Sequence, residues 1–189
     1  MKKSFTMLLS LAAVATFASP VVARAQVSNP LKFTVFGGAA LPSGDVSNDF
    51  KTGYTVGGAV DLRAPLMPVG LRGELTYSSL GAKDTGGLES LNMTNLGGNA
   101  NAVFWMPSAG TPLTAYLTAG PSYGHVKVKA SDSGVSGEVS QNKWGFNAGG
   151  GIDFGLSGLS TRLDVRYVQL SMDNGGKYKT VPITFGITF

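Results

Sequence analysis

The chain has 189 residues, of which 43% are hydrophobic, 27 are Gly and only 14% are charged, whereas soluble domains carry about 25% charged residues. The absence of Cys excludes a disulfide scaffold and a thiolate metal site, and the single His125 excludes a multi-histidine zinc site, so no cofactor or metal is expected. Three of the 15 Lys and Arg residues precede position 26, which leaves 12 cations against 11 anions, so no basic face for nucleic acid is expected.

The first 25 residues have the features of a secretory signal peptide. Two lysines precede an apolar run, and Ala23 and Ala25 form a small-x-small cleavage pattern. We expect cleavage after Ala25 and one mature domain over residues 26–189. An uncleaved anchor is the alternative, but the apolar run is shorter than the roughly 20 residues that a spanning helix needs. The leader predicts export in a Gram-negative bacterium.

Apolar and polar residues alternate with period two along the rest of the chain, which is typical of β-strands. The final segment is the clearest, because Val181, Ile183, Phe185, Ile187 and Phe189 alternate with small or hydroxylic residues. No apolar run after residue 25 is long enough for a membrane helix. Eight such segments are predicted, near residues 31–35, 54–63, 71–77, 95–104, 113–119, 143–155, 161–171 and 180–189.

The connections between these segments alternate in length. Three short ones contain Pro or Gly, at residues 65–68, 107–112 and 156–160, and four longer polar ones lie at residues 42–51, 81–91, 129–142 and 172–179. Short turns at one end and long loops at the other predict an all-β fold, an eight-stranded antiparallel up-and-down transmembrane β-barrel. Pro121 and Gly124 interrupt the alternation between residues 120 and 129, where we expect a bulge or a bend.

The charged residues of the strands decide which face points inward, because a soluble barrel of the lipocalin kind has its apolar face inside. Nine charged residues lie on the face opposite the apolar one, in the half nearest the short turns. Five cations meet four anions there, which predicts an enclosed ion network, since isolated buried charge is costly. The predicted members of this network are Lys32, Asp61, Arg63, Arg72, Glu74, Asp153, Arg162, Asp164 and Arg166.

Aromatic residues on the apolar face fall into two groups, one at each end of the predicted barrel. Tyr and Trp favour the interface between water and lipid, so two aromatic girdles are expected for a transmembrane barrel. The predicted girdle at the long-loop end contains Tyr54, Tyr77, Tyr123, Trp144 and Tyr167. The one at the short-turn end contains Phe33, Phe104, Phe154 and Phe189.

The mature chain resembles the small eight-stranded outer-membrane barrels of the OmpA transmembrane-domain and OmpX type. The most specific element is the terminal alternation of Phe185, Ile187 and Phe189, which resembles the signal recognised by the outer-membrane assembly machinery. Residues 115–123 also resemble a central strand of such barrels. The resemblance implies an integral outer-membrane location, contacts with outer-membrane lipid and lipopolysaccharide, assistance from the barrel assembly machinery, and a monomer.

An eight-stranded barrel leaves an interior that side chains fill, so we expect a plugged barrel and no catalytic residues. The predicted function is non-enzymatic, in envelope integrity or in surface interactions through four extracellular loops, whose mixed charge indicates no particular ligand. One alternative is a lipid A-modifying acyl hydrolase or transferase that uses His125 with Ser122. Another is a narrow small-solute channel, in which Asn95, Asn99 and Asn101 hold water instead of forming an interior ladder.

Overall fold

The computed structural model is described here for seven stretches of the chain that together contain every predicted strand. The predicted signal peptide, its cleavage residues Ala23 and Ala25, and the start of the mature domain lie outside the described residues. The described residues are 30–63, 67–83, 90–106, 112–132, 135–156, 159–171 and 176–189.

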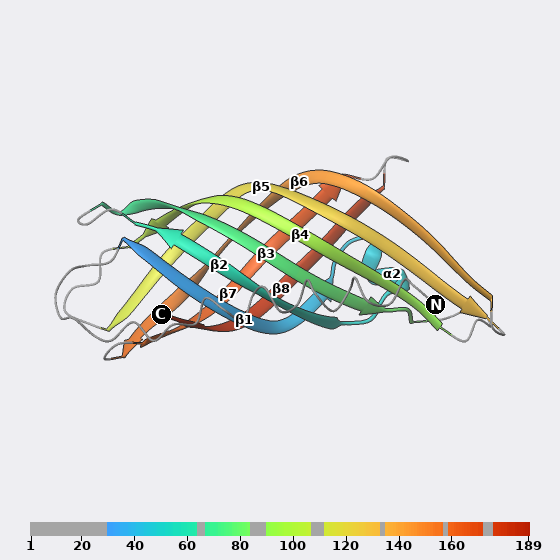
Figure 1. Cartoon of the computed structure of the whole chain (residues 1–189), viewed down its shortest axis with the longest axis horizontal. Coiled ribbons are helices and arrows are strands. Elements are labelled where there is room, and N and C mark those ends of the chain that lie inside the picture. The colour runs from blue at the N-terminus through green and yellow to red at the C-terminus, as the bar shows by residue number, and fades with distance from the viewer. Residues whose placement is uncertain are drawn as a thin grey trace, which may run out of the picture.

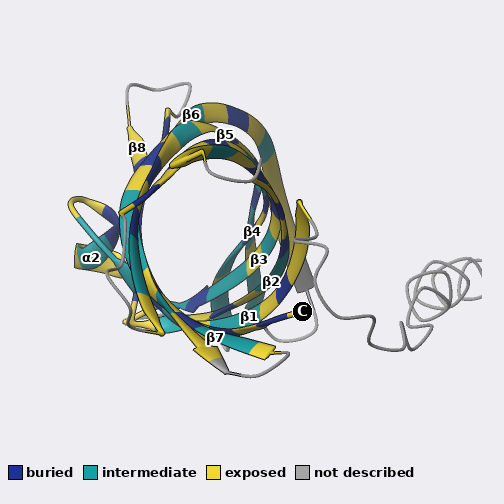
Figure 2. Cartoon of the chain, turned by 90° about the vertical axis from the view of Figure 1, so that its left-hand side faces the viewer, coloured by how far each residue is buried: buried dark blue, intermediate teal, exposed yellow. Residues whose placement is uncertain are grey.

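Eight antiparallel strands form one closed barrel, as predicted (Figure 1). Each strand pairs with the next one along the chain, and β1 pairs with β8, so the sheet closes on itself. Figure 2 shows the closed ring from the end that carries the C-terminus. The strands are β1 (Leu31–Pro42), β2 (Gly53–Leu62), β3 (Val69–Gly81), β4 (Ser90–Trp105), β5 (Leu113–Asp132), β6 (Val135–Leu156), β7 (Leu159–Ser171) and β8 (Lys177–Thr188).

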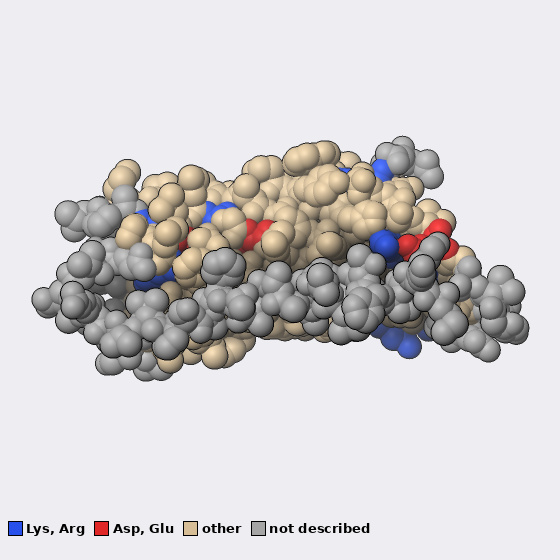
Figure 3. Space-filling model, in the orientation of Figure 1, with Lys and Arg blue, Asp and Glu red and all other residues tan. Residues whose placement is uncertain are grey.

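The barrel has its apolar side chains outside and its polar ones inside. On β1, Val35 is 64% exposed while its neighbour Thr34 is buried, and on β3, Leu75 is 71% exposed while Glu74 is buried. Residues other than Lys, Arg, Asp and Glu form most of the wall in Figure 3. Period-two alternation places neighbouring residues on opposite faces of a strand, so it produces this inside-out arrangement directly.

The only helix in the described part of the chain is short. It is α2 (Val46–Asp49), a single turn in the connection between β1 and β2. No helix of the described residues is long and apolar enough to cross a membrane.

The bulge expected between residues 120 and 129 is absent, and that part of the prediction was wrong. Asn99 opposes Ser122 and Ala102 opposes Ala119, so β4 and β5 stay in phase across Pro121. The register between β5 and β6 is also continuous through this stretch. Pro121 has no N–H to donate, which removes a bond of the ladder without changing the register.

The long loop predicted over residues 129–142 is mostly strand. β5 continues to Asp132 and β6 begins at Val135, whereas β6 pairs with β7 only from Gly145 onward. We call residues 124–132 of β5 with residues 135–144 of β6 the outer hairpin. Toward the right of Figure 1, β4, β5 and β6 run on past α2, so this hairpin extends beyond the barrel mouth.

Candidate functional site

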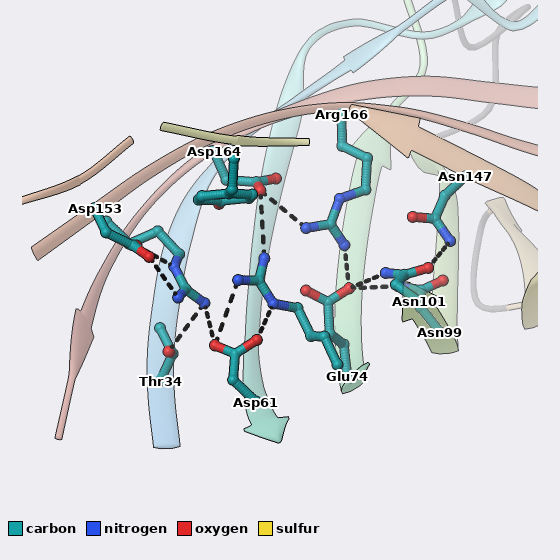
Figure 4. Close-up of polar contacts among 12 residues, drawn as sticks. Thr34, Asp61, Glu74, Asn99, Asn101, Asn147, Asp153, Asp164 and Arg166 are labelled. Atoms are coloured by element: carbon teal, nitrogen blue, oxygen red, sulfur yellow. Dashed lines mark hydrogen bonds and ion pairs between the residues drawn. The ribbon is translucent and has the colours of Figure 1, made fainter. Parts of the chain in front are cut away.

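The inner half of the barrel, toward the short turns, holds a chain of buried ion pairs. Asp61 and Arg72 are cross-strand partners of β2 and β3, and Arg72 Nε donates to Asp61 Oδ1 at 2.5 Å. Arg162 Nη1 donates to the other oxygen of Asp61 at 2.8 Å, and its Nε donates to Asp153 at 2.6 Å. One carboxylate therefore joins two guanidinium groups (Figure 4).

A second set of pairs continues this chain across the interior. Arg166 Nη1 donates to Glu74 Oε2, and Arg166 Nη2 donates to Asp164 Oδ2 at 3.0 Å. Tyr116 donates its hydroxyl hydrogen to the same oxygen at 2.5 Å. The guanidinium carbon of Arg72 stands 4.6 Å from the centre of the Tyr116 ring. These contacts link β2, β3, β5, β6 and β7 across the lumen.

The structure brings together seven of the nine charged residues predicted for the network, and leaves Lys32 and Arg63 outside it. Both are exposed at the short-turn rim, and no ion pair joins either to another described residue. Arg63 instead lies over the Trp105 ring, 4.8 Å from its centre, and its Nε donates to the Met67 carbonyl at 3.4 Å. Water reaches this rim, so these cations do not need carboxylate partners.

An amide layer adjoins the ion network. The side-chain amides of Asn99 and Asn101 donate to Glu74 Oε2 at 3.3 and 3.2 Å. Asn147 donates to Asn101 Oδ1 at 2.8 Å and to Ser122 Oγ at 2.9 Å. Two of the three predicted asparagines thus form an interior ladder, which favours that interpretation over a water-filled row.

The outer end of the interior is apolar, and sequence reasoning missed this. Seven buried residues form what we call the apolar cap, and two of them, Val46 and Phe50, come from the connection that contains α2. The signal was present, because Leu80, Val126 and Leu170 occupy lumen-facing positions at the outer ends of their strands. The apolar cap consists of Ala40, Val46, Phe50, Leu80, Val126, Leu170 and Tyr178.

A small cavity remains between the ion network and the apolar cap. Its volume is about 50 Å³, and its lining includes Glu74, Asn95, Ser122, Arg166 and Leu170. Two buried polar atoms of these residues, Asn95 Oδ1 and Arg166 Nε, have no hydrogen-bond partner. A water molecule needs roughly 10–15 Å³ of such space, so the cavity has room for a few waters.

The structure does not bring His125 and Ser122 together. Their separation of three residues along β5 places them on opposite faces of the sheet, with Ser122 buried in the lumen. His125 Nδ1 lies 2.6 Å from Asn142 Oδ1 on the outward face. Among the described residues, no group of three or more His, Cys, Asp or Glu side chains is arranged to hold a metal ion.

The predicted girdle residues all stand on the outward-facing parity of their strands. Eight are exposed, and Tyr167 is half-buried, with its ring centre 6.1 Å from that of Phe146. At the long-loop end, the rings of Tyr54 and Tyr77 have centres 6.2 Å apart, and those of Tyr123 and Trp144 are 4.9 Å apart. The short-turn group comprises Phe33, Phe104, Phe154 and Phe189.

The residues of the predicted assembly signal lie on the outer face of the last strand. Phe185, Ile187 and Phe189 are 57%, 42% and 63% exposed. Phe189 also completes the closure of the barrel, because its N–H donates to the Phe33 carbonyl at 2.8 Å and its carbonyl accepts from Phe33 at 3.2 Å.

Solved structures with this fold come from several bacteria. Neisserial surface protein A is 13% identical, with 86% of this chain and 98% of that one covered and a TM-score of 0.61. A major outer membrane protein of Thermus thermophilus is 17% identical, with 85% and 99% covered and a TM-score of 0.59. OprG of Pseudomonas aeruginosa is 15% identical, with 84% and 95% covered and a TM-score of 0.54.

A match to a family model identifies the family of the chain, which the structural similarities alone do not. The comparison with curated proteins returned no match. The model described as "Outer membrane protein beta-barrel domain" matches residues 7–189, nearly the whole chain. This match agrees with the closed barrel, its apolar wall and its polar interior, and it confirms the predicted location in the bacterial outer membrane. The chain belongs to the outer membrane protein beta-barrel domain family.

Proposed function

We propose that this outer-membrane barrel is a plugged, non-enzymatic protein that supports the envelope and presents its outer end for surface interactions. The closed interior is the observation that carries this proposal. An ion network fills the lumen at one level and the apolar cap fills it at another, with a cavity of only about 50 Å³ between them. A solute would have to displace both layers to pass.

The arrangement of β5 argues against the enzymatic alternative. A nucleophile and its base must lie within hydrogen-bond reach of each other. Ser122 faces the lumen and accepts a hydrogen bond from Asn147, whereas His125 faces outward beside Asn142. Mass spectrometry of lipid A from cells with wild-type protein and with His125→Ala tests this alternative. Identical lipid A is expected, and a loss of one acyl modification in the variant would establish an enzyme.

The outer hairpin supports a role at the cell surface. It extends the sheet past the barrel mouth, and loops on a rigid scaffold commonly carry binding functions. Neisserial surface protein A, whose name places it at a surface, has a similar fold. We further propose that the barrel is a monomer in contact with lipopolysaccharide and reaches the membrane through the assembly machinery.

Deletion and complementation test the envelope role. Cells that lack the protein are expected to take up a large hydrophobic dye faster and to lose part of their adhesion to surfaces. Plasmid-borne wild-type protein should restore both. A deletion strain with unchanged permeability and unchanged adhesion would contradict the proposal.

A further inference from the structure

A broad groove crosses the outward wall of the barrel from β1 to β6. Its volume is about 930 Å³ and its lining is almost entirely apolar. The register places Gly58, Leu75 and Gly98 in one cross-strand row that ends at Tyr123 and Trp144. The adjacent row contains Phe33, Val60, Gly73 and Ala100. The groove therefore runs from the short-turn aromatic group to the aromatic pair at the long-loop end.

The fold itself does not require the glycines of this groove. A Cβ at Gly73 would meet no atom within 4 Å, and at Gly58 and Gly98 the nearest atoms would be 3.6 and 3.8 Å away, which are ordinary contacts. By contrast, a Cβ at Gly120 or Gly151 would collide with the backbone of a neighbouring strand. Packing of the barrel strands therefore explains Gly120 and Gly151, but it does not explain why Gly58, Gly73 and Gly98 line the groove.

A cationic pair stands beyond the outer end of the groove. Tyr123, Lys127 and Lys129 share the outward face of β5, and every second residue advances about 7 Å along a strand. Lys127 is therefore roughly 13 Å beyond Tyr123, past the aromatic pair. Both lysines are partly exposed, and their Nζ atoms lie 3.1 and 3.2 Å from the carboxylate of Glu138. Two cations against one carboxylate leave a net positive charge at this place.

We propose that the groove and this lysine pair form one binding site for a phosphorylated acyl glycolipid of the outer leaflet, a lipid A-type molecule. An acyl chain lies in the groove, from the Tyr123–Trp144 pair inward past Gly98 and Gly73. A phosphate lies against Lys127 and Lys129, in competition with the Glu138 carboxylate. The apolar groove is continuous with the lipid-facing wall, and the lysines complement the charge of a phosphate. This inference rests on the proposed contact with lipopolysaccharide and names the residues that make it, but it does not depend on whether the barrel conducts.

Native mass spectrometry of the detergent-purified full chain tests this site. The probes are diphosphoryl hexa-acyl lipid A, the same lipid without its phosphates, and phosphatidylethanolamine. The wild-type chain is expected to retain one lipid A molecule, and to bind the dephosphorylated lipid and the phospholipid about tenfold more weakly.

Two variants separate the parts of the site. Gly73→Leu with Gly98→Leu fills the groove, and Lys127→Ser with Lys129→Ser removes the cations; each double variant should weaken lipid A binding about tenfold. Glu138→Gln frees the lysines and should strengthen binding several-fold. Gly37→Leu is the matched control, because Gly37 faces outward beyond the groove and a Cβ there also makes only ordinary contacts, at 3.6 and 3.7 Å.

The outcomes decide the proposal in either direction. Selective loss of lipid A binding in both double variants, with normal binding in Gly37→Leu, supports it. Equal retention of all three lipids, preference for the phospholipid, or a second copy of the chain in place of lipid would overturn it. If the groove variant does not fold, as shown by its gel migration before and after boiling, the lysine variant and Glu138→Gln decide. They lie outside the membrane-spanning wall, and unchanged lipid A binding in both would overturn the proposal. None of these results bears on the plugged interior.

Discussion

The inner and outer ends of the barrel lumen are packed with side chains of opposite chemistry. Toward the short turns, Arg72 and Arg162 share the carboxylate of Asp61, and further ion pairs lie beside them. Toward the loops, Leu80, Val126 and Leu170 belong to one buried apolar cluster with Phe50. What lies outside the wall explains the difference. At membrane level the outward face contacts lipid, so the apolar side chains point outward and the polar ones point into the lumen. Beyond the mouth the wall meets water, and apolar side chains again turn inward.

The ion network and the apolar cap also differ in which parts of the chain supply their residues. In the ion network, Asp61 with Arg72 and Asp153 with Arg162 are cross-strand partners, and other contacts join strands across the lumen. Every member lies on a strand of the barrel, so we expect the network to open only if the barrel is disrupted. The apolar cap includes Val46 and Phe50 from a connection outside the sheet, so it can open while the barrel stays intact. The predictions below test this difference, beginning with the largest effect.

Asp61→Ala should have the largest effect, because it leaves two buried guanidinium groups with one shared partner fewer. Removing one member of a buried ion pair costs about 3–5 kcal/mol. Urea unfolding in lipid vesicles, followed by tryptophan fluorescence, measures the loss. Lys32→Ala at the exposed rim is the control and should change the free energy of unfolding by less than about 0.5 kcal/mol. Equal effects of the two substitutions would remove the distinction between network and rim.

Phe50→Ser should open the apolar cap without unfolding the barrel. The chain contains no Cys, so Val126→Cys provides a single reporter within the cap. A membrane-impermeant thiol reagent should label this reporter at least about tenfold faster when Phe50 is replaced, because local opening then costs at least about 1.4 kcal/mol less. Lys129→Cys, exposed in both backgrounds, corrects for reagent reactivity. Rapid labelling of Val126→Cys with Phe50 in place would mean that the cap does not close the mouth.

Arg63→Ala should have a smaller effect than any change in the network. The guanidinium contacts the Trp105 ring at an exposed rim, where such contacts contribute about 0.5–1 kcal/mol. The same urea unfolding measurement checks this value. A loss as large as that of Asp61→Ala would place Arg63 in the network after all.

The smallest effect concerns Glu138 in the outer hairpin. Hydrogen bonds from Lys127 and Lys129 lower the pKa of its carboxyl below the ordinary value of 4.5. A lowered pKa means that the ion pairs favour the folded hairpin above the ordinary pKa and that this contribution disappears as the pH falls through the lowered one. An NMR titration should show the Glu138 midpoint rising toward 4.5 in Lys127→Ser with Lys129→Ser. An unchanged midpoint would show that the lysines do not contact Glu138 in solution.

Period-two alternation was enough to predict the eight strands, the closed barrel and the direction of each face, because strand geometry converts sequence parity directly into orientation. It also placed Asp61 and Arg72 on the lumen-facing side of their strands at a similar depth, and the strand register makes them direct cross-strand partners. Lys32 and Arg63 have the same parity, but they lie at an open rim. Their depth depends on where each strand ends, and parity carries no information about that.

The apolar cap depends on tertiary structure that alternation does not describe. Leu80, Val126 and Leu170 have lumen-facing parity, but at membrane level that parity means polar surroundings. Only the folding of residues 46–50 over the mouth makes an apolar layer favourable there. The outer hairpin was missed for a related reason, because Gly and Ser in residues 129–142 are typical of loops while pairing with β5 makes them strand.

Planar-bilayer conductance tests most directly whether two independent layers close the lumen. The comparison uses wild type, Phe50→Ser, the paired change Asp61→Ala with Arg72→Ala, and all three substitutions together. The paired change removes a cation and an anion at once, so it leaves no additional unpaired charge. Steady openings are expected only when both layers are disrupted. Steady openings in the wild type, or in either single-layer variant, would contradict closure by two layers in series.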